Sequence, residues 1–258
     1  MKGSAGVMAL VLGELAAGCA VLLFLTPLWG EVRRGFFKLT GALVLLLALA
    51  AWRSVAAGQV AGSAAGTWSL RLSGALAAIT LAWLVLLFLG RHWPARALGL
   101  ATVPVSVAML AAMAGTAEGS TAVAFLQLLA GAVFLGAVMD GLLLGHWYLT
   151  DRGLSRTPIN RYTAILIASV VLEAVAVIAG GFGPTTAAST FNPLLTSAGL
   201  APWIALGMVG ATALIAVLIR ASLKGTRSSA VQAATGFFYL GAITALTAEL
   251  AAKVRFLP

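Results

Sequence analysis

Eight apolar stretches, each long enough to cross a lipid bilayer, constrain this chain more than any other feature. A hydrocarbon core of roughly 30 Å requires about 20 predominantly apolar residues per helix. The stretches predict helices near residues 6–29, 38–57, 71–90, 97–115, 121–149, 161–182, 201–220 and 229–251. The sequence therefore predicts an all-α, polytopic transmembrane bundle of about eight helices, with residues 1–258 forming a single integral membrane domain.

The composition indicates that lipid surrounds most of the chain. Of its 258 residues, 61% are hydrophobic and only 9% are charged. The mean hydropathy of +1.05 lies well outside the usual range of soluble domains. We therefore expect a multi-pass protein of the inner (plasma) membrane, with lipid as its main neighbour.

The basic residues predict how the bundle is oriented. A net charge of +9 would suggest a nucleic-acid partner in a soluble protein, but here Lys and Arg occur in short connections at helix ends. One set of connections carries Arg33, Arg34, Lys38, Arg91, Arg96, Arg152, Arg156, Arg161, Arg220, Lys224 and Arg227, whereas the other carries only Lys2, Arg53, Arg71, Lys253 and Arg255. Because cytoplasmic loops collect positive charge, we expect the first set inside, both termini extracytoplasmic, and no nucleic-acid partner.

Two connections on the expected outer side carry no charge. They span Gly58–Leu70 and Gly183–Leu200 and are rich in Gly, Ala, Ser and Thr. Such segments are poorly suited to open water. Either a partner protein covers them, or they fold back over the helix bundle as a lid.

Four of the seven acidic residues fall inside predicted helices: Glu14, Asp140, Glu173 and Glu249. An ionisable group costs at least a few kcal/mol in a bilayer, so it normally faces the bundle interior and is partnered there. Helical spacing places Asp140 on one face with Ala132 and Gly136, where small side chains let a neighbouring helix approach closely. These four acids are the first candidates for function.

Their expected depths divide them. Glu14, Glu249 and Arg53 lie toward the outer surface, Glu173 lies near the midplane, and Asp140 and His146 lie toward the cytoplasm. An outer cluster of Glu14, Arg53 and Glu249 is suited to quinone chemistry, because a quinone site needs proton-accepting groups in an apolar cleft. The alternative is structural, with Arg53 pairing with Glu14, and Glu249 with Lys253 four residues later.

The sequence favours no metal or haem centre in this chain. Cys19 is the single cysteine, which excludes an iron–sulfur cluster ligated by this chain alone. His92 and His146 are the only histidines, and each precedes a tryptophan, as interfacial anchors often do. The sequence shows no clustered metal ligands.

The two ends of the chain resemble a known family. The segment Val11-Leu12-Gly13-Glu14-Leu15-Ala16-Ala17-Gly18, followed by Leu28-Trp29-Gly30, is similar to the first helix of the membrane-anchor subunits of DMSO reductase and polysulfide reductase type complexes. The segment from Thr247 to Phe256 resembles their last helix, in which an acidic residue precedes a basic and an aromatic one. DMSO-reductase anchors carry a histidine near the outer end of the second helix, where this chain has Trp52-Arg53.

This resemblance implies a quinone-interacting anchor subunit of a respiratory oxidoreductase. Its cofactor would be menaquinone or ubiquinone, with no redox centre in the chain itself. It would pass electrons to or from an iron–sulfur subunit on the extracytoplasmic face, with a catalytic subunit beyond. The chain would then be a non-catalytic part of the enzyme.

Two other functions fit the same residues. In a proton- or ion-coupled transporter, Asp140, Glu173 and Glu249 at successive depths would form a proton or ion path through the bundle, with His146 as a further candidate member. Pro104 hints at the broken helix typical of transporter sites. In a structural subunit of a larger membrane complex, the buried charges would only hold helices together.

Overall fold

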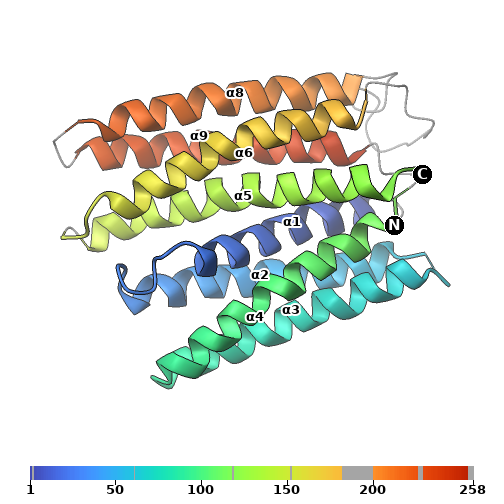
Figure 1. Ribbon diagram of the computed structural model, residues 1–258, viewed down its shortest axis with the longest axis horizontal. Coiled ribbons are helices and arrows are strands. Elements are labelled where there is room, and N and C mark those ends of the chain that lie inside the picture. The colour runs from blue at the N-terminus through green and yellow to red at the C-terminus, as the bar shows by residue number, and fades with distance from the viewer. Residues whose placement is uncertain are drawn as a thin grey trace.

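The computed structural model describes residues 1, 3–60, 62–117, 119–151, 153–181, 200–225 and 229–254 (Figure 1). All regular elements among these residues are α-helices. They are α1 (Gly3–Leu25), α2 (Arg34–Gly58), α3 (Ala64–Phe88), α4 (His92–Ala114), α5 (Thr121–Thr150), α6 (Thr157–Ala179), α8 (Leu200–Leu223) and α9 (Ser229–Val254). Each is long and apolar enough to cross a membrane, which confirms the predicted all-α, multi-pass bundle.

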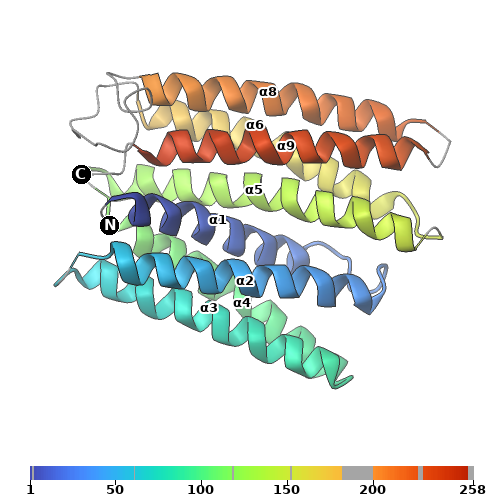
Figure 2. The ribbon, with the colours of Figure 1, turned by 180° about the vertical axis from the view of Figure 1, so that it is seen from behind.

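Successive helices of the described chain run antiparallel, and the helices form two groups (Figures 1 and 2). Figures 1 and 2 show α1 to α4 on one side, and α5, α6, α8 and α9 on the other. Helix α1 joins the groups, because it packs against α2, α4, α5 and α9. Most of its residues are consequently buried, so α1 is shielded from lipid while its neighbours each leave one face exposed.

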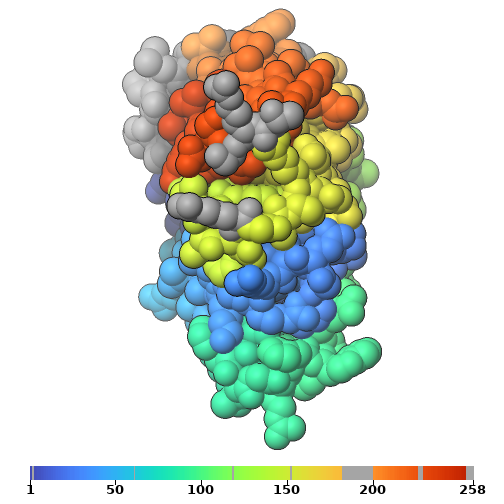
Figure 3. Space-filling view, turned by 90° about the vertical axis from the view of Figure 1, so that its left-hand side faces the viewer, coloured from blue at the N-terminus to red at the C-terminus, as the bar shows by residue number. Residues whose placement is uncertain are grey.

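The two ends of the bundle differ in charge. We call the end at which α1 begins and α9 ends the termini end, and the opposite end the basic end. The basic end faces the viewer in Figure 3. It carries nine of the eleven residues of the larger basic set, since Arg152 and Arg227 lie outside the described residues. By the distribution of positive charge, the basic end is expected to be cytoplasmic.

One predicted loop is largely helical. The segment Gly58–Leu70 was predicted as a long outer connection, but α2 extends to Gly58 and α3 begins at Ala64. The Ser63 hydroxyl caps α3 by accepting a hydrogen bond of 3.1 Å from the Gly66 amide. A run of small residues is compatible with a helix once its end is capped and its face is packed. The second predicted loop, Gly183–Leu200, lies outside the described residues except for Leu200, which begins α8.

Helix α4 is not broken at its proline. Pro104 lies inside the continuous helix His92–Ala114, so the predicted hint of a transporter-like interruption is not realised. A transmembrane helix tolerates proline when neighbouring groups satisfy the freed backbone carbonyl.

Glycines bring α1 and α5 into backbone contact. A Cβ atom added to Gly18 would collide with the backbone carbonyl of Ala132, and one added to Gly136 would collide with the backbone of Gly18. Small residues at such crossings allow close packing where lipid provides no hydrophobic driving force. This contact fixes α1 against α5 beside the buried acidic residues.

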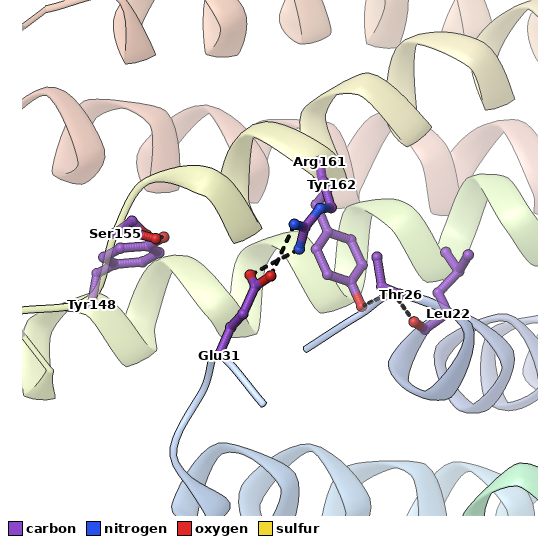
Figure 4. Close-up of polar contacts among 7 residues, drawn as sticks. All are labelled: Leu22, Thr26, Glu31, Tyr148, Ser155, Arg161 and Tyr162. Carbon is purple, nitrogen blue, oxygen red and sulfur yellow. Dashed lines mark hydrogen bonds and ion pairs between the residues drawn. The ribbon is translucent and has the colours of Figure 1, made fainter. Parts of the chain in front are cut away.

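Two ion pairs tie the connection between α1 and α2 to the other half of the bundle. Arg161 of α6 donates hydrogen bonds of 2.8 and 2.9 Å to the two carboxylate oxygens of Glu31 (Figure 4). Arg33 lies 3.1 Å from Asp151, which follows α5. The hydrogen bonds from Arg161, together with its charge, lower the pKa of Glu31 below its ordinary value.

This lowered pKa predicts a small, pH-dependent contribution to stability. A carboxyl whose pKa is lower in the folded state stabilises the fold above its unfolded pKa, about 4.3 for Glu, and this contribution disappears as the pH falls through the folded pKa. Glu31→Gln is therefore expected to lower the thermal midpoint at pH 7, by less than about 1 kcal/mol because both side chains are partly exposed. Thermal unfolding of the two proteins in detergent should give converging midpoints in acid. A difference that persists in acid would contradict the ion-pair explanation.

Candidate functional site

A fully buried lysine lies between two fully buried glutamates at the centre of the candidate site. The ammonium of Lys253, in the last turn of α9, is 2.8 Å from Glu14 Oε1 and 2.7 Å from Glu249 Oε2. All three side chains have an exposed fraction of 0%. Lys253 thereby joins the middle of α1 to the end of α9.

A third carboxyl group completes the site. Glu173 of α6 is 1% exposed, and its carboxyl is near enough to the Glu249 carboxyl for the two to interact electrostatically. Two buried carboxyl groups that share a hydrogen bond need a proton on one of them. We call Glu14, Glu173, Glu249 and Lys253 the carboxyl cluster.

Helix α5 leaves room for this cluster by presenting a glycine to it. A Cβ atom at Gly131 would lie 2.7 Å from Glu14 Oε1 and 2.8 Å from Glu249 Oε2. One turn earlier, Gln127 donates a hydrogen bond of 3.1 Å to the Ala176 carbonyl of α6. Helix α5 therefore holds α6 in place through Gln127, and the absence of a side chain at Gly131 leaves space for the two carboxyl groups.

The cluster lies in the half of the bundle nearer the termini end. At 1.5 Å per residue, Glu249 and Glu173 lie roughly 8 to 9 Å from the ends of α9 and α6, and Glu14 roughly 17 Å from the start of α1. The Lys253 side chain spans part of this difference, because side chains on a helix tilt toward its N-terminus. The predicted meeting of Glu14 with Glu249 is thus confirmed, and Glu173 joins them instead of standing alone at the midplane.

Arg53 does not form the pair with Glu14 that the structural alternative predicts. Its side chain is exposed, and Glu14 forms its ion pair with Lys253 instead. The alternative pairing of Glu249 with Lys253 at a spacing of four residues is confirmed. Sequence reasoning counted Lys253 as a charge at a helix end and missed that it is shared between two helices.

The charges of the cluster do not balance. Three carboxyl groups surround one ammonium group, so full ionisation would leave two uncompensated negative charges in a site closed to water. Among the described residues, no hydrogen-bond donor reaches Glu14 Oε2, Glu173 Oε2 or Glu249 Oε1. Since unpaired buried charge is very costly, charge balance among the described residues favours a proton on two of the three carboxyl groups.

A second polar site lies in the other half of the bundle. The Tyr162 hydroxyl donates a hydrogen bond of 3.0 Å to Asp140 Oδ2 and lies 3.3 Å from the Thr26 hydroxyl (Figure 4). The buried thiol of Cys19 is a further neighbour of the Asp140 carboxyl. The inward orientation predicted for Asp140 is confirmed, whereas its partner Tyr162 gave no signal in the sequence.

His146 belongs to neither site. Its Nε2 lies 2.7 Å from the Tyr239 hydroxyl of α9, and its Nδ1 lies 3.0 Å from the Leu142 carbonyl. Within the described part of the chain, the predicted path of Asp140, Glu173 and His146 is therefore not one hydrogen-bonded network. The described residues contain no group of three or more His, Cys, Asp or Glu side chains that could hold a metal ion.

Comparisons of the chain with protein-family models, with curated proteins and with solved structures found no match. Function must therefore be argued from the chemistry of the two buried sites.

Proposed function

We propose that this chain is a quinone-interacting membrane-anchor subunit of a multi-subunit oxidoreductase. In this role the carboxyl cluster takes up and releases protons near the termini end. The observation that carries the proposal is the meeting of three buried carboxyl groups around one lysine, of which two must hold a proton for the site to be neutral. The resemblance of the first and last helices to known anchors supports it, because these helices supply Glu14, Glu249 and Lys253.

The chemistry of the cluster fits a quinone partner. A bound menaquinone or ubiquinone would supply the two-electron, two-proton chemistry. Glu173 and Glu249 would hold a proton between them, and Lys253 would keep Glu14 ionised as a fixed counter-charge. The positive charge of Lys253 would also stabilise the carboxylate that remains when a proton leaves the site. The iron–sulfur and catalytic subunits would lie on the extracytoplasmic face, beyond the termini end.

The second buried site favours a different function, a proton-coupled transporter. Asp140 lies in the opposite half of the bundle and is 0% exposed, so the protein has a buried carboxyl group in each half. A proton that crosses the membrane would need a buried carboxyl group in each half of the bundle. In the anchor proposal, by contrast, only the carboxyl cluster exchanges protons, and Asp140 has a structural role.

We expect Glu173→Gln to abolish proton exchange at the carboxyl cluster without unfolding the protein. The substitution keeps the size and polarity of the side chain and leaves both ion pairs of Lys253 intact. The pH-induced infrared difference spectrum of the purified protein should lose a protonated-carboxyl C=O band in this variant. The band should persist in Glu31→Gln, the matched change at an exposed carboxyl. An unchanged spectrum in a folded Glu173→Gln protein would exclude Glu173 as a proton-holding group.

Purification from native membranes then separates the two functions. An anchor should purify with an iron-containing partner and with extractable quinone, and the Glu173→Gln complex should assemble but lose most of its quinol oxidation activity. A transporter should purify without iron. In liposomes it should move protons, as reported by an internal pH-sensitive dye, and Asp140→Asn should stop that movement.

A further inference from the structure

A polar cavity lies at the basic end of the bundle, at the opposite end from the carboxyl cluster. It has a volume of about 270 Å³ and is lined by Asn160, Thr163, Arg220, Leu223 and Lys224. These residues come from the start of α6 and the end of α8, which lie next to each other in Figure 3. The cavity therefore lies at the depth of the lipid headgroups if the bundle spans the membrane.

The cavity is positively charged. Arg220 and Lys224 both line it and are exposed, and neither belongs to an ion pair among the described residues. The described lining contains no carboxylate. Arg156 adds a third positive charge nearby, because its guanidinium donates hydrogen bonds to the Leu223 and Gly225 carbonyls. Arg220 and Lys224, two cations that face a shared cavity, are suited to an anion.

The neutral lining residues suit the same ligand. Asn160, in the first turns of α6, offers an amide with two donor hydrogens. The buried Thr163 hydroxyl already donates 2.8 Å to the Ile159 carbonyl, so only its lone pairs are left for a ligand hydroxyl. The positive end of the α6 dipole lies at this position and favours negative charge. The donors are therefore arranged for an oxyanion that also carries a hydroxyl.

The outer surface of α8 provides a place for an acyl chain. Leu214 and Val217, which precede Arg220 on α8, are 63% and 58% exposed. A phospholipid whose phosphate entered the cavity would lay its chain along these residues toward the bilayer centre.

We propose that this cavity binds a phosphate group, carried either by the headgroup of an anionic phospholipid or by a free phosphate. Arg220 and Lys224 bind the phosphate oxygens, and Asn160 and Thr163 bind the ester or glycerol part. The site depends on neither the carboxyl cluster nor the proposed quinone chemistry.

The test compares two double variants with the same loss of charge. Arg220→Gln/Lys224→Gln removes both cations from the cavity. Arg91→Gln/Arg96→Gln removes two exposed cations from the same end of the bundle at the start of α4. Native mass spectrometry in neutral detergent measures the binding of added phosphatidylglycerol, and competition with inorganic phosphate measures the affinity for the free anion.

We expect one tightly retained phosphatidylglycerol in the unaltered protein. Each removed cation should weaken its binding roughly 5-fold, and the cavity double variant roughly 25-fold in all. The Arg91→Gln/Arg96→Gln protein should bind it nearly as well as the unaltered protein. Displacement by millimolar phosphate would identify a free phosphate as the ligand, whereas resistance to it would identify the lipid. Equal losses in the two double variants, or no retained phosphatidylglycerol and no phosphate binding, would overturn the proposal.

Discussion

Lys253→Met is expected to destabilise the protein by about 3 to 5 kcal/mol, the usual cost of removing one partner from a buried ion pair. Lys253 is the shared partner of Glu14 and Glu249, and all three are fully buried. Without the ammonium group, a remaining carboxylate is left in a site that excludes water. Thermal unfolding in detergent, followed by loss of the monodisperse chromatographic peak, measures the effect.

The destabilisation of Lys253→Met should depend on pH and on the neighbouring charges. It should become smaller as the pH falls, because carboxyl groups that hold a proton need no counter-charge. Adding Glu14→Gln and Glu249→Gln should recover much of the stability for the same reason. Lys38→Met is the matched control, since the ammonium of Lys38 lies over the Phe88 ring and not in an ion pair, and it should cost less than about 1 kcal/mol. A Lys253→Met protein as stable as the control would show that the buried pairs contribute nothing.

Gly18→Ala is expected to cost about 3 kcal/mol or more, at the upper end of the range for overpacked sites. The added Cβ would collide with the Ala132 carbonyl of α5, and a backbone atom cannot turn aside as a side chain can. The α1–α5 crossing must therefore open, which also moves Glu14 away from Lys253. Both the thermal midpoint and the infrared carboxyl signal should change.

Gly210→Ala provides the control for the glycine substitution. Gly210 lies in α8, and a Cβ atom there would meet nothing within 4 Å. The same added methyl group should be neutral or slightly stabilising, because Ala favours a helix over Gly by roughly 0.5 to 1 kcal/mol. If Gly18→Ala were equally harmless, the close contact between α1 and α5 would not be needed for folding.

The two buried sites explain why this bundle retains charges that are costly in a membrane. Glu14, Glu173 and Glu249 come from three different helices, and Lys253 links two of them. If their only role were to lock helices, one carboxylate for one ammonium would suffice. The surplus of carboxyl groups over cations is what favours proton exchange over a purely structural role.

The sequence by itself determined the class of the fold. Hydropathy and length report directly whether a segment can satisfy its backbone in lipid, since a membrane-spanning chain must form its hydrogen bonds within each helix. This local rule predicted each of the eight helices in the described part of the chain. It failed at residues 64–70, where the low hydropathy of Gly, Ala, Ser and Thr concealed the first turns of α3. It also predicted that Glu14, Asp140, Glu173 and Glu249 would face inward, because the cost of exposing them to lipid does not depend on the neighbouring helices.

Only the tertiary structure decided which of these groups meet. The sequence predicts Arg53 as the partner of Glu14 and Lys253 as the partner of Glu249 alone, because depth and spacing do not show which helices are neighbours. Lys253 is the partner of Glu14 because α1 packs against α9 beside Gly131 of α5. This contact depends on the shapes of helix surfaces that are far apart in the sequence. The partnership of Asp140 with Tyr162 and the cavity between α6 and α8 likewise depend on how helices pack. Hydropathy reports whether each single segment prefers lipid. Which side chains meet depends instead on which helices pack together, and the hydropathy of a single segment does not show this.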